Sequence, residues 1–200
     1  PAMKADPLIV EKLQEHNALI NIEDYNHSYP HCWRRKTPLI FTSTPQWFIS
    51  MNKNNLNKDA LKHIKNINWE PSWGLQRIES MLTDRPDWCI SRQRNWGVPI
   101  TLVVHKDTGE IHPNQKDLFE KFAQIIEKEG ISAWDKLNLK DYIDDHEEYI
   151  KTSDSLDVWF DSGVTHYAVT AKRFGNNTVA DLYLEGSDQH RGWFHSSLLE

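Results

Sequence analysis

A run of polar and glycine residues, Glu185 to His190, follows a short apolar stretch near the end of the sequence. Glu185 could anchor a cation or a hydroxyl group. Asp188 and Gln189 offer acceptors and donors that suit ribose hydroxyls and the polar end of a small substrate. Gly186 has no Cβ, so a ligand can approach its backbone closely. The run is typical of a small-molecule site, although a capping loop before a helix uses the same residue types.

Trp159 lies between two carboxylates, Asp157 and Asp161. Alternate residues of a strand share one face, so in a strand all three side chains would point the same way. A tryptophan flanked by two carboxylates on one face makes a poor apolar core. We therefore interpret Trp159 as the edge of a pocket.

The segment Ser91-Arg92-Gln93-Arg94 places two guanidinium groups beside two neutral polar side chains. Arginine binds phosphate or carboxylate through a bidentate fork, so this segment could hold an anion. An ion pair with one of the many acids of the chain is an equally good interpretation. His166, His190 and His195 form no nucleophile–base pattern, and we predict no catalytic residue of that kind.

Strands and helices must position these residues, and the sequence predicts a mixed α/β fold. Leu182 to Leu184 is typical of a short buried strand, and Ser187 or Asp188 can cap a following helix with Trp193 on its inner face. A strand, a polar turn and a helix form the half-unit of a doubly wound sheet, which binds ligands at the carboxyl ends of its strands. Further strands are predicted at residues 87–91 and 155–160.

Helical periodicity predicts three longer helices. Asp6-Pro7 begins the first, Trp73 to Thr83 forms the second, and Asn114 caps the third, which Gly130 ends. A hairpin is predicted for residues 100–112 around Asp107-Thr108-Gly109.

Composition narrows the function classes. The chain has 200 residues and a formal net charge of -6, which argues against a generally basic nucleic-acid-binding surface. Its two cysteines, Cys32 and Cys89, are too few for a disulfide scaffold and fit a reducing cytosol. No apolar run approaches the roughly 20 residues of a membrane span, so we expect a cytoplasmic protein without membrane contact.

Four ordered motifs resemble those of bacterial isoleucyl-tRNA synthetases, which are class I aminoacyl-tRNA synthetases. They are Ser28 to Arg34, Trp88 to Pro99, Asp157 to Gly163, and Glu185 to Phe194. The resemblance covers nearly the whole chain, and four long motifs in order are far more specific than a lone glycine pattern. It implies part of a doubly wound, Rossmann-like catalytic domain with inserted helical and hairpin segments.

The resemblance also implies a domain organisation. We expect residues 1–50 to be the end of the editing insertion and 51–90 a helical connecting region. Residues 91–200 would be part of the catalytic domain, with an insertion at about 104–150. The His-x-Gly-His and Lys-Met-Ser-Lys-Ser motifs of the family are absent from this sequence. We therefore expect an internal fragment that is inactive alone.

For the intact enzyme, the resemblance implies activation of L-isoleucine with ATP and Mg²⁺ to isoleucyl-adenylate, and transfer to tRNA(Ile) by a monomer. Glu185, Gly186, Asp188 and Gln189 match the residues of the family that bind the adenylate. Trp159 and Trp193 match the aromatic walls of the isoleucine side-chain pocket. Some relatives bind zinc through cysteine pairs near positions 32 and 89. Here Cys32 and Cys89 each lack a paired cysteine, so we predict no zinc.

Other interpretations stay open. Valyl and leucyl synthetases share the fold. Paired acids such as Asp157, Asp161 and Glu185, together with many tryptophans, are also what carbohydrate-active hydrolases use. A third class is an RNA-contacting module without catalysis, whose binding would depend steeply on salt.

Overall fold

The computed structural model describes residues 5–200. The chain divides into two compact units, Pro1–Pro45 and Gln46–Glu200. Each unit is described by itself. None of the helices within residues 5–200 is both long and apolar enough to cross a lipid bilayer.

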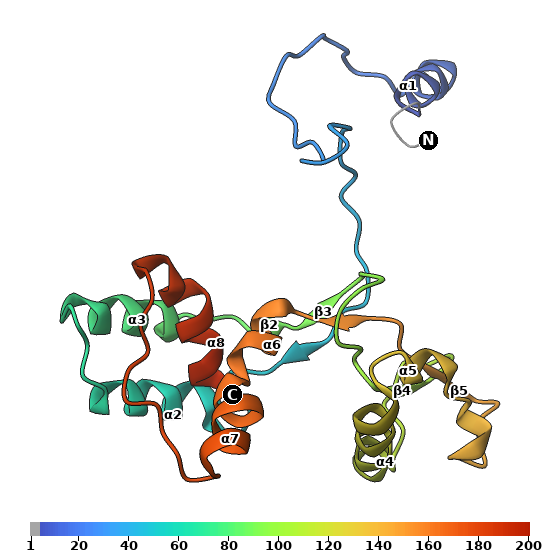
Figure 1. The fold of residues 1–200 in the computed structure, drawn as a ribbon. Coiled ribbons are helices and arrows are strands. Elements are labelled where there is room, and N and C mark those ends of the chain that lie inside the picture. Colours follow the sequence, from blue (N-terminus) through green and yellow to red (C-terminus); the bar gives the residue numbers. More distant parts are fainter. Residues whose placement is uncertain (1–4) are drawn as a thin grey trace. The chain divides into compact units, whose positions relative to one another are not determined.

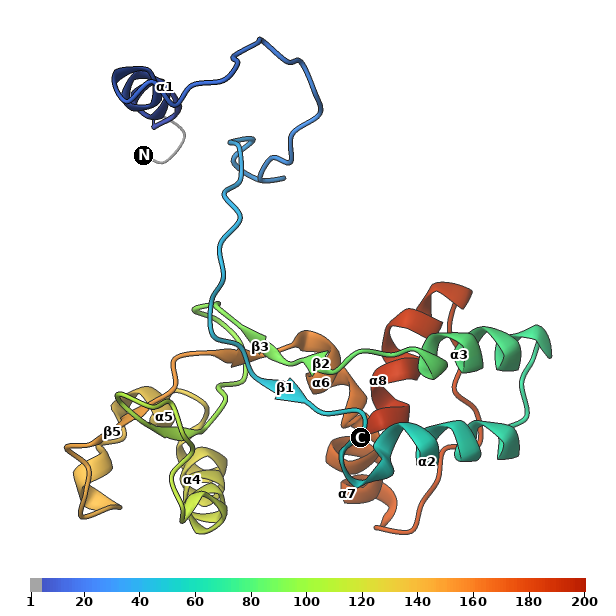
Figure 2. The same cartoon turned by 180° about the vertical axis from the view of Figure 1, so that it is seen from behind.

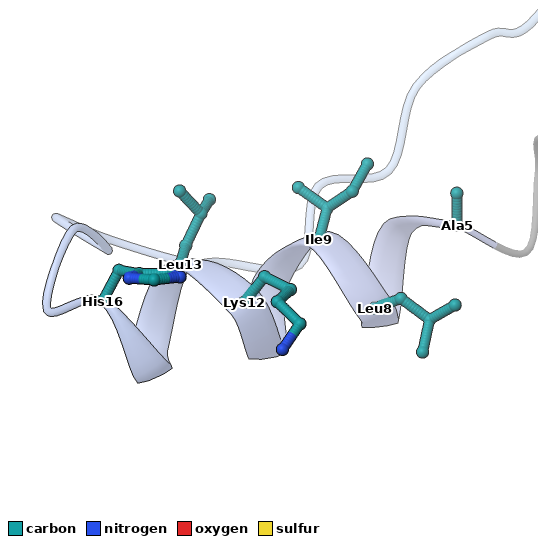
Figure 3. A pocket seen from close by; sticks show the side chains of 6 residues that line it. All are labelled: Ala5, Leu8, Ile9, Lys12, Leu13 and His16. Carbon is teal, nitrogen blue, oxygen red and sulfur yellow. The ribbon is translucent and has the colours of Figure 1, made fainter.

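In the first unit, the described residues 5–45 contain one helix, α1 (Asp6–Glu15), followed by irregular chain (Figure 1). Pro7 stands in its first turn, as predicted, and Asn17, just beyond its end, has a positive φ of 53°. Leu8, Ile9 and Leu13 project from the helix and are exposed (Figure 3). The described residues of the first unit therefore do not cover the apolar face that was predicted to be the inner face of this helix.

The second unit begins with a helical core, whose helices α2, α3 and α8 lie together in both views (Figure 1 and Figure 2). Helix α2 is Leu56–His63, α3 is Trp73–Thr83 and α8 is Trp193–Leu199. Ile78 and Leu82 of α3 are buried four residues apart, because that spacing places them on one face. The other buried apolar residues of this core are Met51, Ala60, Ile64, Trp88 and Leu199.

A second core forms around α4 (Gln115–Glu129) and α5 (Ala133–Lys136). Phe122 of α4 meets the ring of Trp134 edge to face, with 5.2 Å between ring centroids. The Gln115 side chain ties α4 to the preceding chain, because it accepts from Val103 N at 2.8 Å and donates to the Thr101 carbonyl at 3.0 Å. The helix predicted after Asn114 is confirmed, and it ends at Gly130 with φ of 83°.

The sheet content differs from the prediction. The part of the chain that the structure describes contains three sheets of two strands each, and every pair is antiparallel. The pairs are β1 (Phe48–Ile49) with β2 (Trp88–Cys89), β3 (Ser91–Arg92) with β6 (Ser155–Leu156), and β4 (Val103–His105) with β5 (Tyr149–Lys151). The mixed α/β character is confirmed, but no doubly wound parallel sheet is formed within these residues.

The predicted turn at Asp107-Thr108-Gly109 is present. His105 N donates to the Glu110 carbonyl at 2.9 Å, and Gly109 has a φ of 71°. The main partner of β4 is β5, however, and residue 111 adds only an isolated bridge. The remaining elements are η2 (Lys53–Asn55), η3 (Ile64–Asn66), η4 (Leu139–Asp141), α6 (Val158–Gly163), η5 (His166–Ala171), α7 (Lys172–Phe174) and η6 (Ser187–Arg191).

Candidate functional site

Trp159 lies on a helix, so the strand predicted for residues 155–160 is wrong beyond Leu156. Strand β6 ends at Leu156, and α6 begins directly afterwards at Val158. The reason is Asp157, whose carboxylate caps the helix by accepting from Trp159 N at 3.4 Å. Aspartate is a favoured N-cap residue, and here that local interaction replaces the alternating pattern of a strand.

The second motif also starts differently from the prediction. Residues 182–184 form no strand within the described part of the chain, and Leu182 and Leu184 are 72% and 77% exposed. The polar run then forms the turn η6, and Gly192 joins it to α8. Neither Ser187 nor Asp188 caps this helix. Gly192 occupies the N-cap position, and the first N–H of the helix, Trp193 N, donates to Gln189 Oε1 at 2.9 Å.

The two motifs meet where α6 packs against α8. An open pocket of about 380 Å³ lies there, lined by Trp159, Ser162, Thr165, Glu185, Gln189 and Trp193. Four of these residues were predicted for the site from the sequence, two as pocket walls and two as polar contacts. The fold thus brings together both tryptophans and both long polar side chains.

The indole of Trp193 is held in a fixed orientation. Its Nε1 donates to the Ser162 carbonyl at 2.9 Å, and Tyr183 stacks on its ring with 4.4 Å between centroids. The same carbonyl accepts from Thr165 Oγ1 at 2.6 Å. Trp193 therefore presents one ring face to Tyr183 and stays anchored to the end of α6, which carries the opposite wall of the pocket.

Gly186 and Asp188 flank the pocket without lining it. Asp188 Oδ2 accepts from Gln189 Nε2 at 3.0 Å, so Asp188 orients the amide that reaches the pocket. A Cβ at Gly186 would lie 2.7 Å from Asp188 Oδ1, which is shorter than the contact distance of nonbonded carbon and oxygen atoms. The glycine at position 186 therefore leaves room for the Asp188 carboxylate in its observed position.

Arg92 forms an ion pair instead of an open anion site. Its Nη2 lies 2.9 Å from Asp157 Oδ2, and Trp88 Nε1 donates to the same oxygen at 3.3 Å. Arg92 Nη1 donates to the carbonyls of Cys89 and Ser91 at 2.9 and 2.8 Å. These contacts connect the motif of residues 88–99 to the cap of α6, and they leave Asp157 unavailable as a free acid.

Two carboxyl groups at α6, those of Asp161 and Glu200, have raised pKa values. Burial raises the pKa of Asp161, and the nearby Asp157 raises it further. Burial together with Asp161 raises the pKa of Glu200 to about 7. Neither carboxylate lines the pocket.

Within residues 5–200 no group of three or more His, Cys, Asp or Glu side chains is placed to hold a metal ion. Cys32 and Cys89 are free thiols. Cys32 Sγ accepts from Arg35 N at 3.5 Å, and that backbone hydrogen bond, together with the one from Arg34, lowers the pKa of the thiol. The prediction that no zinc is bound stays a prediction.

Comparison with known proteins identifies the family. Residues 8–200 match the family described as tRNA synthetases class I (I, L, M and V). The chain belongs to this family. Relatives include proteins named isoleucine--tRNA ligase from Vibrio vulnificus (strain YJ016), 58% identical over 198 residues, and from Pseudoalteromonas atlantica, 59% identical over 197 residues. A third, from Ruthia magnifica, is 58% identical over 197 residues.

Each of these alignments covers 98% of this chain and 21% of the relative. The chain therefore spans about a fifth of the length of these class I synthetases.

In this synthetase chain, two pocket residues escaped the sequence interpretation. Ser162 and Thr165 line the pocket, and the Ser162 carbonyl that holds Trp193 also accepts from Thr165 Oγ1. A helical interpretation of residues 158–165 would have placed Ser162 near Trp159, since residues three apart are neighbours on a helix. In a strand, Trp159 and Ser162 would point to opposite faces, so the predicted strand did not indicate that they are neighbours.

Proposed function

We propose that the whole protein is an isoleucine–tRNA ligase, and that these residues form part of its amino-acid and adenylate site. The enzyme would join the carboxylate of L-isoleucine to the α-phosphate of ATP, with breakage of the bond to the β-phosphate and release of pyrophosphate. The isoleucyl group would then pass to tRNA(Ile). The observation that carries the proposal is the meeting of Trp159, Glu185, Gln189 and Trp193 at one pocket. Family membership and the relatives named isoleucine--tRNA ligase support it.

Trp159 and Trp193 would be the walls that select the amino-acid side chain. Isoleucine offers no side-chain hydrogen bonds, so only shape and burial can recognise it. Trp159 is 40% exposed, which leaves part of its ring free to meet a ligand. One methylene more or less in such a pocket is worth about 1–3 kcal/mol, so valine would be rejected incompletely and editing would be needed.

Glu185, Gly186, Asp188 and Gln189 would bind the polar part of isoleucyl-adenylate. Glu185 is exposed at the pocket and can accept from an ammonium group or a hydroxyl. Asp188 fixes the Gln189 amide by the hydrogen bond described above. Activation needs positioning and charge stabilisation rather than a covalent intermediate, so a site without a nucleophile–base pair is sufficient.

The remaining features follow from the same proposal. ATP would act with Mg²⁺, tRNA(Ile) would be the acceptor, and no zinc would bind to these residues. The enzyme would be a cytoplasmic monomer. Residues 1–50 would be the end of the editing insertion, and residues 51–90 would be a helical connecting region. Residues 91–200 would belong to the catalytic domain, with an insertion at about 104–150.

The doubly wound sheet also belongs to the proposal. Leu182 and Leu184 are apolar and exposed, and their segment has no partner strand in the region described. A strand needs neighbours for its backbone groups and a cover for its apolar side chains. We propose that this segment joins the parallel sheet of the whole catalytic domain.

The test is isoleucine-dependent exchange of pyrophosphate into ATP by the purified full-length protein. Isoleucine, valine and leucine are compared at equal concentrations. The proposal expects the highest kcat/KM for isoleucine. Preference for valine or leucine would assign the protein to another branch of the family, and exchange with none of the three would refute the proposed activity.

A further inference from the structure

His190 is the buried residue of turn η6 and does not line the pocket. Gln189 lines the pocket, whereas His190, the next residue, is 5% exposed and packs into the helical core. Its ring stacks on Trp69 and lies against Trp73, with centroid distances of 5.8 and 5.9 Å. Phe194 of α8 meets it edge to face at 5.5 Å. Three aromatic rings from two segments thus surround the imidazole.

The two nitrogens of His190 have different surroundings. Nδ1 lies 2.8 Å from the Ser187 carbonyl, and a carbonyl can only accept, so Nδ1 carries the proton. This hydrogen bond closes the turn that carries Asp188 and Gln189. Nε2 is buried and has no hydrogen-bond partner within the residues that the structure describes.

Helix α3 accommodates the imidazole through a glycine. A Cβ at Gly74 would lie 3.2 Å from His190 Nε2 and 3.0 Å from Trp69 Cε3. Both distances are tighter than ordinary van der Waals contact, so an alanine at 74 would press on the histidine ring. The first turn of α3 and turn η6 are therefore fitted to each other at this point.

We propose that His190 is a positioning residue for amino-acid activation. It fastens the turn of residues 187–191 to Trp69, Trp73 and Gly74, and thereby fixes Asp188 and Gln189 at the pocket. This inference rests on the proposed function of the pocket.

The position of His190 predicts a distinctive kinetic effect. The turn would hold the polar part of the substrate, which isoleucine and valine share. Loosening it should therefore lower kcat/KM for both amino acids by the same factor, on the order of 10- to 100-fold for a displacement near 1 Å. The ratio of the two kcat/KM values should stay at the parent value, unlike the effect of changing either tryptophan wall.

The experiment uses full-length protein with His190→Phe, His190→Asn, Gly74→Ala and Ile78→Val. His190→Phe keeps the aromatic packing but removes the Nδ1 donor, and His190→Asn keeps an N–H group but loses the ring contacts. Gly74→Ala presses on the ring from α3, although alanine is the better helix former. Ile78→Val is the matched control, since Ile78 is buried in the same helix without contributing to the turn.

The readouts are kcat and KM in pyrophosphate exchange with isoleucine and with valine. Affinity for a non-hydrolysable isoleucyl-adenylate analogue and the thermal midpoint are also measured. The three changes at 190 and 74 should weaken analogue binding and lower kcat/KM equally for both amino acids. Ile78→Val should lower only the thermal midpoint. Parent-like kcat/KM in folded His190→Phe and His190→Asn would overturn the inference, as would equal losses in Ile78→Val.

Failure of the proposed function would be recognised separately. A parent protein that prefers valine would refute the isoleucine assignment, but the ratios between variants and parent would still test His190. A parent protein with no exchange and no affinity for the analogue would refute both.

Discussion

The guanidinium of Arg92 lies 2.9 Å from the carboxylate of Asp157, and this ion pair joins two motifs that are distant in the sequence. Asp157 also caps the helix that carries Trp159, and it accepts from Trp88. One carboxylate therefore fixes strand β3, the start of α6 and an aromatic core residue. The pocket wall at Trp159 depends on this arrangement.

Replacing Asp157 with asparagine should destabilise the protein while keeping the helix cap. Asparagine is an equally good N-cap residue, so the loss comes from the ion pair with Arg92. We expect a loss of about 1.5–3 kcal/mol in unfolding free energy. Denaturant unfolding measures it, with Asp144→Asn, an exposed change, as the control. Equal stability of Asp157→Asn and the parent would show that the ion pair contributes nothing.

Trimming either pocket wall should reduce discrimination between isoleucine and valine. Trp159→Ala or Trp193→Ala removes apolar contact with the side chain and leaves a void, and such truncations cost about 3–5 kcal/mol in packed sites. Activation of isoleucine should fall by orders of magnitude, and the extra methylene should no longer meet a wall. The measurement is kcat/KM for both amino acids in full-length protein, with thermal melting to detect unfolding.

The control for the pocket walls is Trp96→Ala, because Trp96 is 94% exposed. Trp134 is less suitable, since it is buried in the core around α4 and its loss would disturb folding. A folded Trp159→Ala enzyme that still discriminates like the parent would remove Trp159 from the pocket.

Trp193→Phe should have a smaller effect than Trp193→Ala. Phenylalanine retains an aromatic wall but cannot donate to the Ser162 carbonyl, so one hydrogen bond worth about 0.5–1.5 kcal/mol is lost. We expect kcat/KM for isoleucine to fall by up to about tenfold. If Trp193→Phe and Trp193→Ala were equally impaired, the hydrogen bond would matter more than the ring.

The helices could be predicted from the sequence because their signals are local. Helix α3 has the predicted bounds, Trp73–Thr83, and α4 ends at Gly130 as expected. Apolar spacing and a terminal glycine act within a few residues of each other, so a single sequence contains the information.

The strands could not be predicted as well because a strand needs a distant partner. Leu182 to Leu184 has a strand-like composition, yet no strand pairs with it within the described residues. Residues 157–163 have both strand-like alternation and a capping aspartate, and the cap prevailed. The tryptophan walls were predicted through family resemblance, whereas Ser162 and Thr165 depended on the helical geometry of α6.

The lowered pKa of His195 should make the unfolding free energy depend on pH. Burial, reinforced by the Arg85 guanidinium at 3.3 Å, lowers the pKa of His195 from 6.5 to about 4. At His195 the unfolded chain therefore binds more protons than the folded chain between those values, so the contribution of His195 to the unfolding free energy should rise with pH across that window. Below about pH 4 both states are protonated, and the contribution of His195 stays lost.

His195→Asn keeps an acceptor for Arg85 but removes the titration. Denaturant unfolding from pH 4 to 7 should show that the unfolding free energy of the parent minus that of this variant rises with pH. NMR titration of the histidine rings, assigned by the resonance missing in the variant, should give a pKa near the lowered value. Identical pH slopes would contradict the assignment.

Gly192→Ala should distort the pocket from the junction between η6 and α8. A Cβ at this position would lie 2.5 Å from Gln189 Oε1 and 2.9 Å from Trp159 Cη2, so both pocket residues must move. We expect a loss of activation on the order of 100-fold, the scale associated with a 1 Å misplacement, and a lower affinity for the adenylate analogue.

The double variant Gly192→Ala with Trp159→Phe tests the cause of that loss. Phenylalanine lacks the outer ring atoms that the new Cβ would meet, so the double variant should recover thermal stability relative to Gly192→Ala alone. Discrimination against valine should remain poor, since the wall is smaller. If Trp159→Phe lowers stability by the same amount in the presence and absence of Gly192→Ala, the two positions are not coupled, and the contact between Gly192 and Trp159 does not shape the pocket.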